Sequence, residues 1–207
     1  MLSGSPIRQE LFDGNRLKGL QLCGFNEEKP VILVIGGSLG AAAINEAVRK
    51  ALPVLLPSYQ IIHVCGKGKV DTSIQNHPGY IQFDYVKEEL SDLLAAADLV
   101  ISRAGSNAIC EFLALNKPNI LIPLPANASR GDQILNAASF EKQGFSYLLP
   151  EEMVNDESLS NAVNEVFENR ETYIQAMKTA PASGAIDIIV NLCDEAVRSR
   201  KKRKKTK

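Results

Sequence analysis

Two glycine-containing loops of this chain each separate an apolar segment from a segment with helical patterning, and both could bind a phosphate group. The first loop is Gly36–Gly40, and the second is Arg103–Asn107. Glycine places no side chain between the backbone and a bound anion, and the N–H groups at the start of a helix have no intrahelical acceptor. We therefore expect the backbone of both loops, together with the Ser38 hydroxyl, to approach a phosphate closely.

The second loop leads to a carboxylate that could bind a sugar. Gly105 permits a positive φ, and Ser106 and Asn107 are suited to cap a helix that begins at Ala108. Glu111 would then lie one to two turns into that helix, where its oxygens could accept hydrogen bonds from vicinal hydroxyls. The alternative for Glu111 is a purely structural role as a partner of the helix dipole.

Three further polar residues, Asp132, Gln133 and Asn136, begin the helix that follows the strand predicted at Asn119–Pro123. Each of them alone could be only a helix cap. Because they follow the end of a neighbouring strand, we expect them to face the same crevice as the glycine loops. Phosphate donors, a carboxylate for vicinal hydroxyls and a carboxamide pair for a sugar together indicate a nucleotide-sugar site.

The elements that must position these residues alternate between strands and helices. Apolar runs predict strands at Val31–Ile35, Gln60–Cys65, Tyr80–Phe83, Leu99–Ser102 and Asn119–Pro123, with a further short strand ending near Leu149. Helical patterning is found at Ala41–Leu52, Glu88–Ala97, Ala108–Leu115, Leu159–Phe167, Tyr173–Met177 and Ala185–Val197. This alternation predicts an α/β domain with a parallel sheet, whose ligands bind at the carboxyl ends of the strands.

Length and composition restrict the class of protein. The 207 residues suit one domain, and no apolar run approaches the length of about 20 residues that a membrane-spanning helix needs. The four cysteines, Cys23, Cys65, Cys110 and Cys193, have no metal-ligand spacing and are expected to be buried free thiols. His63 lies on an apolar strand and is expected to be a hydrogen-bonded core residue. We expect no metal ion and no cofactor.

Basic residues are concentrated at the C-terminus. Residues 198–207, RSRKKRKKTK, contain eight of the 23 Lys and Arg side chains, which leaves 15 against 24 acidic ones in the rest of the chain. This acidic remainder argues against nucleic acid as the main partner. The tail has no apolar residue, so we expect it to be disordered, and it could bind an anionic membrane surface, RNA or no specific partner.

Several stretches resemble, in order and spacing, the C-terminal half of the MurG family of bacterial glycosyltransferases. They are LVIGGSLGAAAINEAV, IIHVCGKG, FDYVKEELSDLLAAADLVISRAGSNAICEFLALNKPNILIPLP and DQILNA, and the resemblance extends from about residue 5 to about residue 197. The family transfers N-acetylglucosamine from UDP-N-acetylglucosamine to lipid I, which forms lipid II in peptidoglycan synthesis. It has the GT-B fold of two Rossmann-like domains, and this chain resembles the donor-binding one.

The resemblance implies a role for each candidate residue. It implies that Gly37, Ser38 and the backbone of Ser106 and Asn107 contact the diphosphate, Tyr85 and Val86 the uracil, Glu111 the ribose, and Asp132 and Gln133 the N-acetylglucosamine. Arg8 matches the arginine of the family's interdomain segment. No Asp-x-Asp metal-binding motif is present in the sequence.

The resemblance also implies a domain organisation. Residues 1–29 would be an interdomain linker and lead-in, 30–197 the UDP-sugar-binding domain, and 198–207 the tail. The family's acceptor-binding domain, with its proposed catalytic base, would precede residue 5. We therefore expect no catalytic residue in this chain, no sugar transfer by the chain alone, and an undecaprenyl-linked acceptor held by another domain or subunit at the cytoplasmic face of the membrane.

Two alternatives to this interpretation are kept. One is the donor-binding subunit of a glycosyltransferase whose acceptor site belongs to a separate membrane-bound chain. The other is a non-catalytic module that binds a nucleotide sugar without transferring it.

Overall fold

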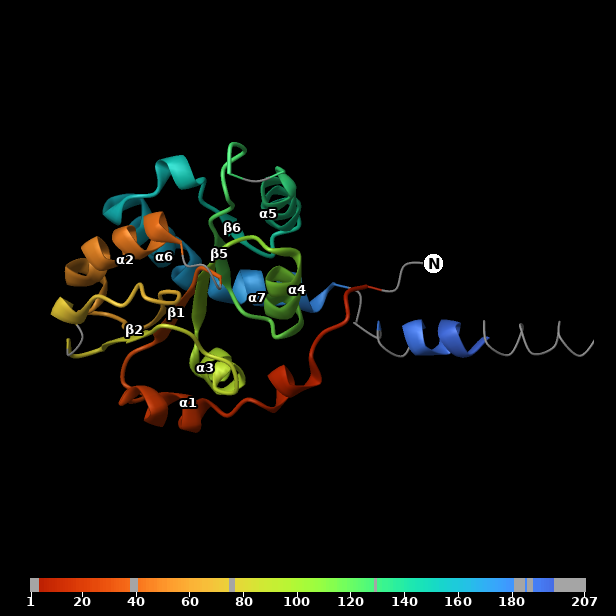
Figure 1. The fold of residues 1–207 in the computed structure, drawn as a ribbon, viewed down its shortest axis with the longest axis horizontal. Helices are drawn as coiled ribbons and strands as arrows, with labels where there is room; N and C mark the ends of the chain where they lie inside the picture. The colour runs from red at the N-terminus through yellow and green to blue at the C-terminus, as the bar shows by residue number, and fades with distance from the viewer. Residues whose placement is uncertain are drawn as a thin grey trace, which may run out of the picture.

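The computed structural model describes residues 4–37, 41–74, 77–128, 130–180, 185 and 188–195. Within these ranges the chain forms one parallel sheet with helices on both faces (Figure 1). The strands are β1 (Val31–Ile35), β2 (Gln60–Val64), β3 (Tyr80–Phe83), β4 (Leu99–Ser102), β5 (Asn119–Leu121) and β6 (Tyr147–Leu148). Their order in the sheet is β3-β2-β1-β4-β5-β6, and every neighbouring pair is parallel. The predicted α/β fold with a parallel sheet is confirmed.

Helices lie before the first strand, between the strands and after the last of them. They are α1 (Arg16–Cys23), α2 (Ala42–Leu55), α3 (Leu90–Ala96), α4 (Ser106–Ala114), α5 (Asp132–Lys142), α6 (Asp156–Glu168) and α7 (Arg170–Lys178), with short 3-10 helices η1 (Gln9–Asp13), η2 (Thr72–Ile74) and η3 (Glu151–Met153). Among the described helices, none has an apolar stretch long enough to cross a bilayer.

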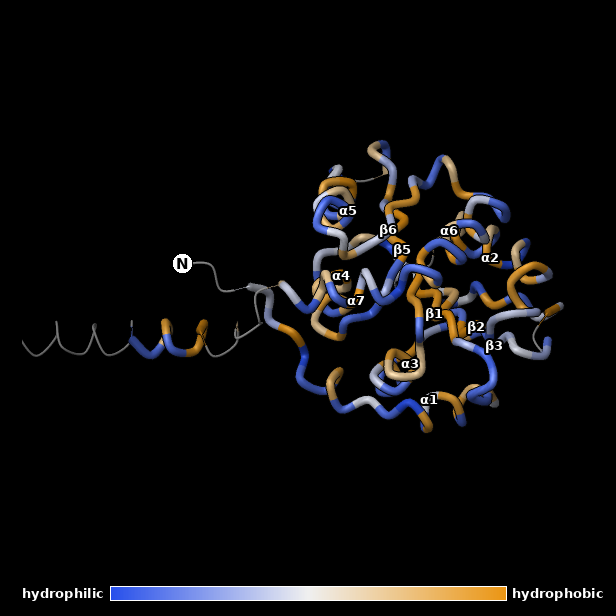
Figure 2. The backbone as a smooth tube through the Cα atoms, turned by 180° about the vertical axis from the view of Figure 1, so that it is seen from behind, coloured by the Kyte–Doolittle hydropathy of each residue, from blue (hydrophilic) through white to orange (hydrophobic). Residues whose placement is uncertain are grey.

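The core is divided between the two faces of the sheet because successive side chains of a strand point to opposite faces. In β1, Ile32 and Val34 pack with α2 and α6, whereas Val31 and Leu33 pack with α1 and α3. All four side chains are essentially inaccessible to solvent, and Figure 2 shows the apolar colour concentrated on these central strands. Burial on both faces explains why the strands are continuous apolar runs rather than alternating ones.

The lead-in before β1 packs onto this core. Leu11, Leu20 and Cys23 are buried in the same cluster as α3. Two glycines permit the close approach of the lead-in to α3. A Cβ on Gly14 would lie 2.1 Å from the carbonyl oxygen of Ser91, and a Cβ on Gly19 would lie 2.2 Å from that of Asp92.

Replacing Gly19 by alanine should therefore destabilise the fold. The new methyl group would force α1 away from the backbone of α3, and overpacking of this kind costs about 1–3 kcal/mol. Urea unfolding of the variant measures the loss. The control is Lys18→Ala, an exposed position on the same helix, which should leave stability nearly unchanged; equal stability of the two variants would show that α1 is free to shift.

Several sequence-based predictions are wrong in detail. α4 begins at Ser106 rather than Ala108, because Gly105, with a φ of −68°, is the N-cap. Cys193 is exposed, since residues 188–195 form helical turns that lie away from the sheet (Figure 1). Ile189 and Val190 of the same stretch are also exposed. Ile186 and the basic tail lie outside the described residues.

Candidate functional site

The sheet brings the two glycine loops together. β1 and β4 are neighbours although β2 and β3 lie between them in the sequence, so the strand order reverses between β1 and β4. Their last residues, Ile35 and Ser102, are paired, and the Ser102 hydroxyl donates a hydrogen bond of 2.9 Å to the Ile35 carbonyl oxygen. In an open α/β sheet, ligands bind in the crevice at this reversal, outside the carboxyl ends of the strands.

The first loop leaves β1 through two glycines with different functions. A Cβ on Gly36 would lie 2.8 Å from the Cβ of Ala41, so only glycine allows this turn so close to the start of α2. Gly37 has a φ of +94°, which side chains disfavour, and a Cβ there would meet no described atom within 4 Å. Among the described residues, none therefore blocks the approach of a ligand to the Gly37 backbone. Ser38, predicted to contact the diphosphate, lies outside the described residues.

The second loop ends in the exposed N-terminus of α4. Gly105 is the N-cap and, as a glycine, supplies no side-chain capping hydrogen bond. Ser106 and Asn107 are the first two helical residues and are exposed. N–H groups at these positions have no intrahelical acceptor, and the helix dipole makes this end electropositive. The geometry suits an anion beside the Gly37 backbone.

The first turn of α5 is fixed against the same loop. The Asn136 side-chain amide donates a hydrogen bond of 3.0 Å to the Ala104 carbonyl oxygen, and the Gln133 carbonyl oxygen accepts one of 3.1 Å from the Leu124 N–H. Gln133 therefore uses part of its hydrogen-bonding capacity within the protein. Asp132 is the first residue of α5 and is exposed, so its carboxylate is accessible to a ligand.

Arg103 was not singled out by the sequence reasoning but helps to shape the crevice. Its guanidinium donates hydrogen bonds to the carbonyl oxygens of Ile122 at 3.1 Å and Pro123 at 3.3 Å, and it forms an ion pair with Glu151 of η3. It thereby links the carboxyl ends of β4 and β5. The signal in the sequence was an arginine directly after an apolar strand, and recognising its role required knowing which strand lies next to β4.

Arg8 and Glu111 form an ion pair that the sequence did not predict. Arg8 Nε donates to Glu111 Oε1 at 2.9 Å, and an Nη of Arg8 donates to Glu111 Oε2 at 3.1 Å. The Glu111 side chain is 13% exposed and that of Arg8 is 49% exposed. The hydrogen bonds to Glu111 raise the pKa of the Arg8 guanidinium. The lead-in segment therefore contacts the residue predicted to bind ribose.

Tyr85 and Val86 lie on the Arg8 side of the crevice. Val86 is buried in the cluster that contains Leu11 of η1 and Phe112 of α4, whereas Tyr85 is 63% exposed. Tyr85 is close enough to Arg8 to contribute to the raised pKa of that guanidinium. The structure thus gathers four predicted residues, Arg8, Tyr85, Val86 and Glu111, around the flank of α4.

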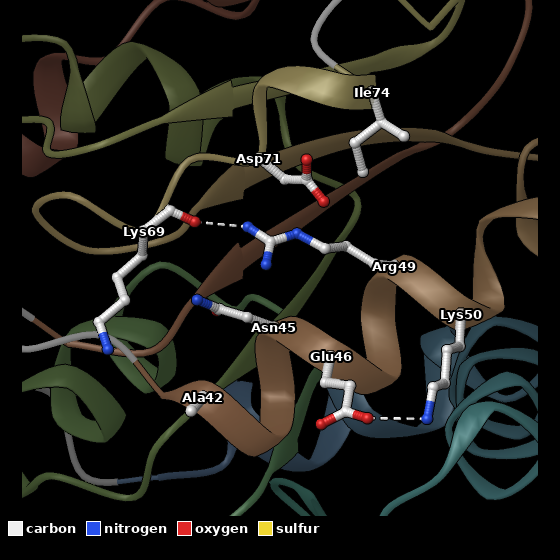
Figure 3. A pocket seen from close by; sticks show the side chains of 8 residues that line it. All are labelled: Ala42, Asn45, Glu46, Arg49, Lys50, Lys69, Asp71 and Ile74. Carbon is white, nitrogen blue, oxygen red and sulfur yellow. Dashed lines mark hydrogen bonds and ion pairs between the residues drawn. The ribbon is translucent and has the colours of Figure 1, made fainter.

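A separate pocket of about 540 Å³ lies on the flank of α2. Its lining residues are Ala42, Asn45, Glu46, Arg49, Lys50, Lys69, Asp71 and Ile74 (Figure 3). Glu46 pairs with Lys50 at 2.8 Å, and Arg49 donates to the Lys69 carbonyl oxygen at 2.5 Å. Among the described residues, no predicted site residue lines this pocket, so we do not assign the site to it.

Behind this pocket is a buried hydrogen-bonded histidine. His63 is inaccessible to solvent, with Nδ1 2.8 Å from the Tyr80 hydroxyl and Nε2 3.0 Å from Asn45 Oδ1. The Asn45 amide nitrogen donates to the Cys65 carbonyl oxygen, so Asn45 Oδ1 accepts and His63 Nε2 carries the proton. Burial lowers the pKa of His63 to about 3. The prediction that His63 is a satisfied core residue is confirmed.

Comparison with protein families gives a match over most of the chain. The glycosyltransferase family 28 C-terminal domain matches residues 31–192. Curated proteins named UDP-N-acetylglucosamine--N-acetylmuramyl-(pentapeptide) pyrophosphoryl-undecaprenol N-acetylglucosamine transferase are similar to it. The protein from Lachnoclostridium phytofermentans is 60% identical over 195 residues, covering 94% of this chain and 55% of the relative. The protein from Clostridium novyi is 53% identical over 196 residues, with the same coverage. The chain thus spans about half the length of the curated relatives it matches.

Solved structures agree on the fold. The crystal structure of Acinetobacter baumannii MurG superposes with a TM-score of 0.71 at 23% identity, covering 94% of this chain and 57% of that one. A glycosyltransferase of kitacinnamycin superposes with a TM-score of 0.62 at 19% identity over 91% of this chain. The sheet and its helices are therefore those of a single half of such glycosyltransferases.

Proposed function

This chain belongs to the glycosyltransferase family 28 C-terminal domain family, and we propose that it is the part of an N-acetylglucosaminyltransferase that binds UDP-N-acetylglucosamine. The observation that carries the proposal is the pairing of β1 with β4 at the reversal of the strand order, since Gly37 follows β1 and the exposed start of α4, the helix of Glu111, follows β4. Relatives that are 53–60% identical are named as transferases of N-acetylglucosamine from UDP-N-acetylglucosamine, which supports this identity of the sugar and the nucleotide. The whole reaction would be the conversion of lipid I to lipid II in peptidoglycan synthesis.

Each end of the donor has a chemically suited partner in this assignment. The diphosphate would bind at the exposed start of α4 and at Gly37, where unpaired N–H groups face an anion. The uracil would lie against Val86, beside the exposed ring of Tyr85. The ribose hydroxyls would donate to Glu111, and Asp132 with the remaining amide group of Gln133 would contact the N-acetylglucosamine.

The same geometry suits the transfer step. An acceptor hydroxyl would attack the anomeric carbon of the sugar, the bond from that carbon to the diphosphate oxygen would break, and UDP would leave with the electron pair. The N–H groups at the start of α4 would stabilise the negative charge that develops on the diphosphate. We propose that this chain uses no metal ion or cofactor for the step.

The acceptor would be held elsewhere. We propose that an undecaprenyl-linked sugar is bound by another domain or subunit, which would also supply the base that removes the proton from the attacking hydroxyl. Such an arrangement would operate at the cytoplasmic face of the membrane. The basic residues 198–207 would add attraction to an anionic leaflet, at up to about 1 kcal/mol per Lys or Arg near the surface.

The isolated chain should bind UDP and UDP-N-acetylglucosamine but should not transfer the sugar. Isothermal titration calorimetry with UDP, UDP-N-acetylglucosamine and ADP measures the first part, and a transfer assay with a soluble lipid I analogue measures the second. Failure of UDP to bind at millimolar concentration would overturn the proposed function. Transfer by the chain alone would instead contradict the separation of donor and acceptor sites.

If UDP-N-acetylglucosamine binds, adding the separate acceptor-binding half distinguishes the alternatives. Restored transfer supports the transferase or its two-subunit form. No transfer with a folded acceptor-binding half would favour a non-catalytic module that binds the nucleotide sugar.

A further inference from the structure

The Arg8–Glu111 contact joins two segments that are far apart in the chain. Arg8 lies in the lead-in before the first strand, and Glu111 lies in α4, yet two hydrogen bonds of 2.9 and 3.1 Å connect their side chains. Each carboxylate oxygen of Glu111 accepts one of them. The arrangement is the two-pronged pairing in which the planar guanidinium matches the geometry of a carboxylate.

The backbone on both sides of this pair is held in place. Ile7, next to Arg8, is 7% exposed, and Leu11, which is 3% exposed, donates its N–H to the Arg8 carbonyl oxygen at 3.2 Å. On the other side, Ile109 and Phe112 flank Glu111 and are each 3% exposed. The two side chains therefore meet between segments whose backbones are held by buried neighbours. This burial argues against a lead-in segment that moves freely relative to α4.

The paired carboxylate still has acceptor capacity. An ionised carboxylate offers about four lone-pair positions on its two oxygens, and the fork from Arg8 occupies one on each. One position on each oxygen remains, which is the number that two adjacent ribose hydroxyls require. The two hydrogen bonds also restrict the orientation of the carboxylate, whose side chain is only 13% exposed.

We infer that Arg8 is a positioning residue, which fixes the Glu111 carboxylate so that its remaining lone pairs accept hydrogen bonds from the two ribose hydroxyls of the donor. This inference rests on the proposed function, because it concerns the same nucleotide site. It assigns Arg8 an effect on recognition of the ribose, delivered through Glu111, rather than a contact with the diphosphate. The lead-in segment thereby becomes part of what makes the site selective for a ribonucleotide.

The test compares UDP with 2′-deoxy-UDP, which lacks one of the two hydroxyls. The measured quantity is the ratio of their dissociation constants for each variant of the full chain, by titration calorimetry. The wild-type protein should prefer UDP by about tenfold or more, the loss expected for a hydrogen bond to a charged group. Glu111→Gln should bring the ratio close to unity, and Arg8→Ala should do the same although Glu111 is still present.

Two further variants separate positioning from stability and from charge. Arg16→Ala is the matched control, because Arg16 also lies in the lead-in and forms a similar two-pronged pair. Its partner is Asp98, just before the amino end of β4, and both hydrogen bonds are 3.2 Å long. It should lower stability and leave the ratio at the wild-type value. Arg8→Lys keeps the charge without the fork, so its ratio should remain well below that of the wild type.

The outcomes are distinguishable from failure of the proposed function. If wild-type protein binds no UDP, the proposed function fails and this inference with it. If wild-type protein prefers UDP and Glu111→Gln abolishes the preference, the proposed function stands, and an unchanged ratio in Arg8→Ala would overturn the inference alone. Equal weakening of UDP and 2′-deoxy-UDP by Arg8→Ala would also overturn it, because that result indicates direct contact with the diphosphate.

Discussion

Replacing Glu111 by glutamine should weaken binding of UDP by about 1.5–3 kcal/mol, the usual contribution of hydrogen bonds to a charged group. The variant keeps the shape of the side chain but removes the charge and one acceptor oxygen. Titration calorimetry of the two proteins with UDP measures the loss. Stability should change less, since an ion pair with a half-exposed arginine contributes about 0–1 kcal/mol.

A structural role for Glu111 predicts a different result. Glu111 is the sixth residue of α4, beyond the first turn in which the helix dipole acts appreciably. If Glu111 served only to hold the lead-in through Arg8, Glu111→Gln would lower the midpoint of thermal unfolding without changing the affinity for UDP. The matched control is Glu46→Gln, which breaks the exposed pair with Lys50 on α2 and should alter UDP binding not at all.

Acidification from pH 7.5 to 4.5 should remove roughly 2–3 kcal/mol of stability through His63 alone. The folded-state pKa of His63 is lowered from 6.5 to about 3, mainly by burial and also by the nearby Arg49. Below pH 6.5 the His63 ring is therefore protonated in the unfolded chain but stays neutral in the folded chain. The contribution is fully present above pH 6.5 and is lost progressively as the pH falls towards 3.

Urea unfolding at several pH values measures this loss. Carboxylates titrate in the same range, so the informative quantity is the difference in pH dependence between the wild type and His63→Gln, which lacks the titrating ring. His77→Gln, at an exposed histidine, is the control and should keep the wild-type dependence. Because His63→Gln loses buried hydrogen bonds and could fold poorly, NMR titration of the wild-type His63 ring is the second measurement. A ring that titrates near pH 6 would contradict the predicted coupling.

The sequence by itself determined most of the elements and supplied the candidate residues of the site. The strands Val31–Ile35, Tyr80–Phe83 and Leu99–Ser102 were predicted with the bounds that the structure has, because strands buried on both faces are uninterrupted apolar runs. The glycine loops were also evident, since a glycine between a strand and a helix is a local signal. Boundaries were less accurate at α4, where the chain enters the helix without a side-chain cap.

Only the tertiary structure decided which of these loops meet. Nothing local in the chain states that β1 pairs with β4 instead of β3, yet this pairing places Gly37 beside the start of α4. The role of Arg103 could not be predicted for the same reason, because its acceptors directly follow β5 and their position depends on the pairing of β5 with β4.

The Arg8–Glu111 pair is the clearest case of a feature that sequence reasoning could not reach. Both residues were identified as candidates, but 103 positions separate them in the sequence. Nothing in the local sequence around either residue indicates that the other is its partner. Their contact depends on the burial of Ile7 and Leu11 on one side and of Ile109 and Phe112 on the other. A sequence specifies such a contact only through the packing of the whole core, because apolar burial is non-directional and the geometry of two anchored segments emerges when they are packed together.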